Sequence, residues 1–210
     1  MERMAIGVIT SLDDNPSATL QWVRDLGIHT VQVSAPRDDL LDEDRAENVK
    51  RTAESLGIEI TTIFCGYAGE SYSDIPTIRR TVGLLNPERR KERVQRTFRI
   101  SHYAKWLEVG RVGAHIGFVP EDDRDPVYGD LVLVVGRIAD LCAGNGQSFC
   151  LETGQESAQT LLRFIEDVGR PNVKVNFDPA NMVLYGSGKP IEALELLGRY
   201  VVGVHCLSLI

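Results

Sequence analysis

Long apolar runs and paired cysteines are both missing from this chain of 210 residues. No apolar stretch approaches the roughly 20 residues needed to cross a bilayer. The first ten residues, MERMAIGVIT, carry neither the long apolar run nor the small-residue cleavage site of a secretory signal. The four cysteines lie far apart with no Cys-x-x-Cys pair, which argues against a disulfide framework or a zinc knuckle. We therefore expect a cytoplasmic protein with buried, reduced thiols and no membrane partner.

Positive charge is also scarce. The chain has 23 Lys and Arg against 30 Asp and Glu, a net charge of −7. Nucleic-acid binding needs clustered basic side chains, so we expect no nucleic-acid partner. One basic stretch, residues 88–99, interleaves arginines with glutamates at helical spacing. That pattern is typical of a solvated helix face rather than of a phosphate-binding patch.

A regular alternation of short β-branched runs and amphipathic segments fills the chain. It predicts strands at residues 4–10, 30–34, 59–66, 111–117, 148–153, 173–178 and 201–207, and helices at 16–27, 43–57, 87–109, 130–144, 157–169 and 191–198. No linker or low-complexity tract interrupts this alternation. We therefore expect one domain, residues 1–210, built on a parallel sheet covered by helices.

Three polar residues lie toward the downstream ends of successive predicted strands: Glu152, Asp178 and His205. Their spacings are nearly equal (178 − 152 = 26 and 205 − 178 = 27), about the length of one strand–helix unit. Because the C-terminal ends of parallel strands meet at one face of a barrel, the three side chains should converge there. Carboxylate oxygens and imidazole nitrogens together suit divalent metal ions, so the pattern predicts a metal site.

The alternation along these strands favours a particular fold class. If the three polar residues point inward, the outward positions are apolar, and the inward ones are smaller or polar. This is typical of an α/β (β/α)8 TIM barrel, here with about seven parallel strands and without the last strand–helix units of a barrel of about 250 residues. A doubly wound open sheet is the rival, but VITSLDDNP stands where a glycine-rich dinucleotide-binding turn would be expected.

Five segments at the strand ends form a specific combination: IFCGYAGESYSDIP, HIGFVPED, LETGQE, NFDPANM and VVGVHC, on strands three to seven. Together they resemble the xylose isomerase-like TIM-barrel superfamily, in its sugar phosphate isomerase/epimerase branch. Members of that family bind a divalent metal (Mn²⁺, Mg²⁺, Co²⁺ or Zn²⁺) through Glu, Asp and His on strands five to seven and a Glu on strand eight. The resemblance thus implies Glu152, Asp178 and His205 as metal ligands, with no counterpart for the fourth.

The chain departs from the family pattern near its end and after strand six. Leu207 and Ser208 stand where relatives commonly have Lys-Asp, and the sequence stops at Ile210. We therefore expect a C-terminally truncated barrel, whose open edge could support a homodimer. Asn181 stands where some relatives have a His, and its amide is better suited to a sugar hydroxyl than to a second metal.

The resemblance implies an isomerase or epimerase of a small sugar or sugar phosphate, acting through an enediolate. That reaction removes a proton beside a carbonyl and returns it elsewhere, with help from a metal. Related epimerases use the glutamates of strands five and eight as the acid/base pair, so Glu152 is the predicted catalytic residue, and loss of the other glutamate is expected to impair activity. The alternatives are a non-catalytic remnant or sugar-binding protein and, disfavoured by the acidic charge and only four histidines, an abasic-site endonuclease.

Each candidate also has an ordinary structural interpretation. Glu152 could pair with a basic side chain, Asp178 could cap a helix or turn, and His205 could be a hydrogen-bonded core histidine. Further candidates for substrate contact are His115 at the end of strand four and, in the region that follows strand three, Phe64, Tyr67 and Glu70. These could instead bond or pack within their own loops.

Overall fold

The computed structural model describes residues 4–12 and 15–206. One sheet of seven parallel strands runs through it in the order β1-β2-β3-β4-β5-β6-β7, so each strand pairs with its neighbours in sequence. The strands are β1 (Gly7–Ser11), β2 (Thr30–Ser34), β3 (Glu59–Phe64), β4 (Arg111–Ala114), β5 (Ser148–Glu152), β6 (Val173–Phe177) and β7 (Val201–Val204). The predicted fold class, an incomplete TIM barrel of about seven parallel strands, is confirmed.

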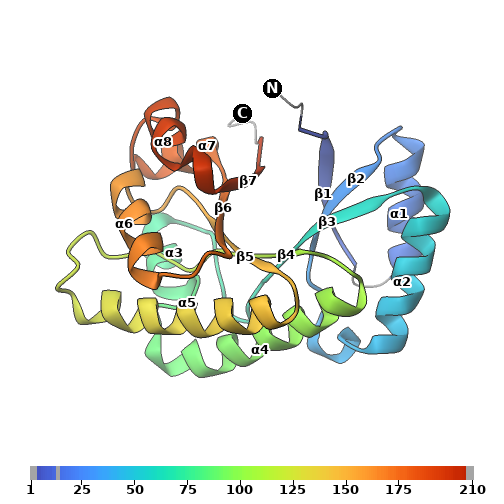
Figure 1. Ribbon diagram of the computed structural model, residues 1–210, viewed down its shortest axis with the longest axis horizontal. Helices are drawn as coiled ribbons and strands as arrows, with labels where there is room; N and C mark the ends of the chain where they lie inside the picture. Colours follow the sequence, from blue (N-terminus) through green and yellow to red (C-terminus); the bar gives the residue numbers. More distant parts are fainter. Residues whose placement is uncertain (1–3, 13–14, 207–210) are drawn as a thin grey trace.

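Helices cover the outer side of this curled sheet (Figure 1). They are α1 (Pro16–Asp25), α2 (Glu43–Leu56), α3 (Ile75–Thr81), α4 (Pro87–Trp106), α5 (Pro126–Gly144), α6 (Ala158–Val168), α7 (Pro179–Tyr185) and α8 (Pro190–Leu197), with short 3-10 turns η1 (Asp38–Leu40) and η2 (Gly198–Tyr200). No helix in the described part of the chain combines the length and the apolarity that crossing a membrane requires. The predicted cytoplasmic location stays a prediction.

Several helices begin at an Asn or Asp followed by proline, as at Asn15, Asn86, Asp125 and Asp178. The side-chain oxygen accepts a hydrogen bond from a free amide of the first turn, and proline occupies the first helical position, where no amide donor is needed. This signal corrects two predictions. Helix α5 starts at Pro126 rather than at residue 130, and the segment after Asp178, where no helix was among those predicted, is helix α7.

The strand boundaries differ most from the prediction at three places. Strand β1 begins at Gly7 rather than at residue 4, and β4 ends at Ala114 rather than at 117. Strand β7 ends at Val204, and the predicted last strand residue, Leu207, lies outside the described residues. The shorter β4 and β7 leave His115 and His205 just past the strand ends.

The hydrophobic core lies between the sheet and its helices. Outward-facing Phe149, Leu151, Val173 and Val175 are fully buried there, as alternation along β5 and β6 predicts. The inward face instead gathers polar side chains toward its C-terminal end. Among the described residues, β1 and β7 each pair with one strand only, so the sheet curls without closing (Figure 1).

Candidate metal centre

Two carboxylates and one imidazole meet at the C-terminal ends of three neighbouring strands. Glu152 is the last residue of β5, Asp178 directly follows β6, and His205 directly follows β7. One donor atom from each lies within 4.8 Å of the other two. Glu152 and Asp178 are 4% and 1% exposed, so both carboxylates are held away from solvent. Equal spacing in a parallel sheet therefore brings these three side chains to one point.

The two oxygens of Asp178 are used differently. Oδ1 accepts hydrogen bonds from the amides of Ala180 (2.9 Å) and Asn181 (3.0 Å), and so caps helix α7. Oδ2 is buried and has no hydrogen-bond partner among the described residues, and it lies 4.0 Å from Nδ1 of His205. A buried polar atom without a partner is costly, and a cation would satisfy it. The capping and metal-binding interpretations of Asp178 are thus compatible.

Both oxygens of Glu152 are engaged. Oε1 lies 2.7 Å from Nδ1 of His205, and Oε2 accepts a hydrogen bond of 2.6 Å from the side-chain amide of Asn176. Burial raises the pKa of Glu152, while the hydrogen bond and charge of His205 act in the opposite direction and the neighbouring Asp178 adds to the rise. A carboxylate whose pKa is raised takes up a proton more readily at neutral pH, as a catalytic base must.

His205 is held on both sides of its ring. Nδ1 faces Glu152, and Nε2 lies 2.7 Å from Oε1 of Gln32, which reaches across the inner face from β2. Sequence reasoning missed Gln32 as part of the site. The available signal was its inward phase on β2, where it alternates with the buried outward-facing Val31 and Val33.

His115 directly follows β4, and its ring centroid lies 6.0 Å from that of Tyr72. Its Nδ1 is buried and has no hydrogen-bond partner within the described part of the chain. Burial, aided by the charge of His205, lowers the pKa of His115 to about 4. The ring is therefore neutral at physiological pH and can bond a hydroxyl group.

Asn181 lies in the first turn of α7, against the loop between β5 and α6. Its side-chain amide donates to the carbonyl of Thr153 at 3.4 Å. Gly154 in that loop has a φ of +127°, and a Cβ at Gly154 would lie 2.3 Å from Cβ of Asn181. Only glycine permits this approach, which fixes Asn181 against the loop that follows Glu152, with its amide on Asp178.

Phe64, Tyr67 and Glu70 have different surroundings. Phe64 ends β3, and its ring centroid lies 5.0 Å from that of His205, so it borders the centre. The hydroxyl of Tyr67 is buried against Thr97, and Glu70 accepts hydrogen bonds from the amides of Tyr67 and Gly83. Both therefore order the loop after β3, and their contact with substrate stays a prediction.

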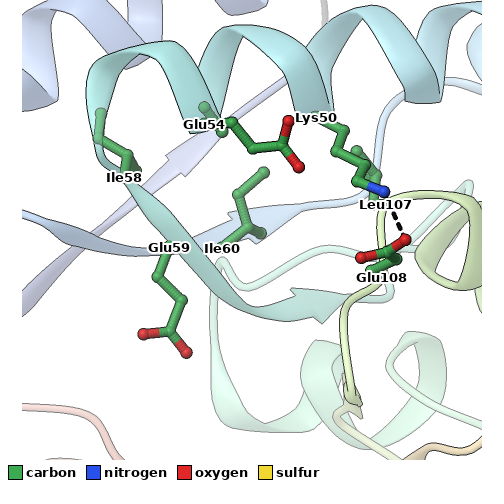
Figure 2. Close-up of a pocket in the computed structure, with 8 residues that line it drawn as sticks. Lys50, Glu54, Ile58, Glu59, Ile60, Leu107 and Glu108 are labelled. Atoms are coloured by element: carbon green, nitrogen blue, oxygen red, sulfur yellow. Dashed lines mark hydrogen bonds and ion pairs between the residues drawn. The ribbon is translucent and has the colours of Figure 1, made fainter.

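A hollow at the opposite end of the barrel has a different character (Figure 2). The start of β3, helix α2 and the residues just after α4 line this hollow. It includes the ion pair between Lys50 Nζ and Glu108 Oε1 at 2.5 Å. Its lining residues Glu59 and Ile60 start β3, whereas the candidate ligands stand at the strand ends. This hollow is therefore not part of the candidate metal centre.

A curled parallel sheet with a polar cluster at the C-terminal strand ends is typical of TIM-barrel enzymes. The sequence model of the family described as "Xylose isomerase-like TIM barrel" matches residues 20–208, and the chain belongs to this family. The predicted resemblance is confirmed. A search of curated proteins finds no match to the chain.

Solved structures agree with this assignment. A xylose isomerase domain protein from Planctomyces limnophilus is 48% identical with a TM-score of 0.91, over 96% of this chain and 71% of that one. A D-psicose 3-epimerase from Clostridium cellulolyticum H10, solved with D-tagatose, is 19% identical (TM-score 0.74; 96% and 72% covered). A xylose isomerase-like TIM barrel protein from Mycobacterium smegmatis, in complex with magnesium, is 18% identical (TM-score 0.68; 95% and 74% covered). The last two show a shared fold.

Proposed function

We propose that this chain binds a divalent metal ion and acts as an isomerase or epimerase on a small sugar or sugar phosphate. The observation that carries the proposal is the convergence of Glu152, Asp178 and His205, with Oδ2 of Asp178 buried and without a partner. Membership of the xylose isomerase-like family and the sugar epimerases among its structural relatives support the choice of substrate class.

The donor set fits the expected cofactor. Glu152, Asp178 and His205 would hold the ion, and two carboxylates with one imidazole suit Mn²⁺, Mg²⁺, Co²⁺ or Zn²⁺. When bound, the metal would polarise a substrate carbonyl and stabilise the negative charge that develops on its oxygen.

The protein groups would handle the proton and the hydroxyls. Glu152, kept in place by Asn176, would take the proton from the carbon beside the carbonyl. His115, which follows β4, and Asn181, in the first turn of α7, would bond substrate hydroxyls, and the Phe64 ring would cover one side. Tyr67 and Glu70 would act by holding the loop after β3 in place.

Isotope exchange tests this function. The protein with Mn²⁺ is incubated with D-fructose, D-tagatose or D-psicose in D2O, and deuterium at the carbon beside the carbonyl is followed by NMR. We expect exchange that disappears in Glu152→Gln and persists in Glu195→Gln, a matched control exposed on α8. Exchange that survives in Glu152→Gln would refute the assigned base.

A sugar-binding protein without turnover is the second candidate. Returning the proton to another face needs a second acid/base group besides Glu152. In the described residues the ligand cluster holds one other carboxylate, Asp178, and that side chain already caps helix α7. Calorimetric binding of a ketose without isotope exchange would decide for this candidate. Neither binding nor exchange with any of the three sugars would refute both.

We also propose self-association through the edges of the sheet. Strands β1 and β7 each have one paired side in the described residues; Ile6, just before β1, and Ile9, within it, are 85% and 48% exposed. Unpaired edges with apolar side chains recruit other strands. Light scattering should show dimers, and Val204→Lys should shift them toward monomer. A monomer at high concentration would contradict this.

A further inference from the structure

Four side chains around the candidate metal centre form a closed ring of hydrogen bonds. Nε2 of Gln32 donates to Oδ1 of Asn176 (3.4 Å), and Nδ2 of Asn176 donates to Oε2 of Glu152 (2.6 Å). Oε1 of Glu152 faces Nδ1 of His205 (2.7 Å), and Nε2 of His205 faces Oε1 of Gln32 (2.7 Å). Three of these residues come from β5, β6 and the end of β7, but Gln32 comes from β2.

The barrel interior is shaped to admit Gln32. Gly203 on β7 pairs with Asn176 on β6. A Cβ at position 203 would lie 2.4 Å from Oδ1 of Asn176 and 3.3 Å from Nε2 of Gln32. Any larger residue at 203 would push the two amides apart. The contact across the interior therefore depends on a glycine, and Gln32 occupies space that this glycine leaves.

The direction of each hydrogen bond in the ring follows from Glu152. An ionised carboxylate only accepts, so Asn176 must turn its NH2 group toward Glu152 and its oxygen toward Gln32. Gln32 then presents its own NH2 group to Asn176 and its oxygen to His205. Nε2 of His205 must consequently carry a hydrogen that faces Gln32. By the same rule Nδ1 donates to the ionised Oε1 of Glu152, and a cation beside Glu152 and Asp178 would displace this hydrogen from Nδ1 while Nε2 keeps its own.

We infer that Gln32 is a positioning residue, which holds His205 in the Nε2–H tautomer with Nδ1 directed at the metal. The inference rests on the metal site of the proposed function and adds the residue that prepares it. Outer partners of this kind typically change metal affinity by about 10- to 100-fold. The competing interpretation is that Gln32 only ties β2 to β6 and β7, in which case its loss would lower stability and leave the site chemistry unchanged.

Two substitutions at this position separate the interpretations. Gln32→Leu removes the acceptor for His205 and the donor to Asn176, whereas Gln32→Glu keeps the acceptor for His205 and removes only the donor. Titration of the full chain with Mn²⁺ by calorimetry should show about 10- to 100-fold weaker binding for Gln32→Leu. Gln32→Glu should bind at least as tightly as the wild type, because a carboxylate accepts from Nε2–H more strongly than an amide does. Gln21→Leu, exposed on α1, serves as the control and should bind like the wild type.

The tautomer itself gives a second readout. In the Zn²⁺-loaded protein, 15N NMR should show a hydrogen on Nε2 of His205, assigned by its absence in His205→Asn. This hydrogen should exchange slowly with solvent in the wild type and in Gln32→Glu, where residue 32 accepts it, and fast in Gln32→Leu, where nothing at position 32 accepts it. If Gln32 only ties the strands together, the exchange rate should be the same in all three proteins.

The outcomes also separate this inference from the proposed function. Equal Mn²⁺ affinity in wild type and Gln32→Leu, or a hydrogen on Nδ1 rather than Nε2 in the Zn²⁺-loaded wild type, would overturn the inference and leave the metal site standing. If the wild type binds no Mn²⁺, both fail. If Gln32 behaves as expected but no ketose is bound or exchanged, only the sugar chemistry fails.

Discussion

Glu156 is a buried carboxyl group whose ionisation should destabilise the fold. It lies in the loop between β5 and α6, is 5% exposed, and accepts hydrogen bonds from the amide of Val119 and from its own amide. Burial raises its pKa from 4.5 to about 8, and the neighbouring Glu121 adds to the rise. The native protein therefore holds Glu156 neutral at pH 7, whereas the unfolded chain ionises it.

The sign of the effect follows from proton linkage. Below pH 4.5 Glu156 is protonated in both the folded and the unfolded protein, so it does not change the free energy of unfolding. Between pH 4.5 and about 8 only the unfolded protein loses this proton, so the free energy of unfolding falls as the pH rises. At about 1.36 kcal/mol per pH unit, the penalty at pH 7 is about 3 kcal/mol, and it levels off near 5 kcal/mol above pH 8.

Replacing Glu156 with Gln should remove this penalty. The amide oxygen still accepts from Val119, so Glu156→Gln should be about 3 kcal/mol more stable than the wild type at pH 7 and nearly equal to it at pH 4.5. Urea unfolding at half-unit steps from pH 4.5 to 8.5 measures the difference between the two proteins. Glu195→Gln, at an exposed position of α8, is the matched control and should show no such trend.

Two results would refute the reasoning about Glu156. One is a difference between Glu156→Gln and wild type that stays constant with pH. The other is a variant that is less stable than the wild type at pH 8, which would mean that the ionised carboxylate is favourable where it lies.

Two further predictions concern the metal centre and its surroundings. Asp178→Asn keeps an oxygen to cap α7, so urea unfolding should give a stability within about 0.5 kcal/mol of wild type. Calorimetry should show Mn²⁺ affinity reduced by at least 10-fold, because the unpartnered Oδ2 is replaced by an amide NH2. A large loss of stability would contradict the proposal that one oxygen of Asp178 caps the helix and the other binds the metal. Gly113→Ala places a Cβ 2.7 Å from the Phe64 ring and should cost about 1–3 kcal/mol in the same assay, whereas Gly129→Ala, in an open helical position of α5, should be neutral or stabilising.

The sequence alone was sufficient to predict the architecture and the convergence of Glu152, Asp178 and His205 at one end of the sheet. Alternation of period two along β5 and β6 separated apolar outward positions such as Phe149 and Val175 from polar inward ones, because a parallel sheet buried under helices imposes that pattern. The equal spacing of Glu152, Asp178 and His205 implied convergence, since each strand–helix unit returns the chain to the same end of the sheet.

Tertiary structure alone decided which polar side chains complete the centre. Gln32 is 144 residues from Asn176 and 173 from His205 in sequence, and only the curvature of the sheet brings β2 opposite β6 and β7. The two roles of Asp178 likewise depend on where α7 starts and on which of its oxygens stays buried without a partner. Periodicity records which face of a strand a residue occupies, but contacts across the interior of a barrel depend on how far the sheet curls and on where a glycine such as Gly203 leaves room.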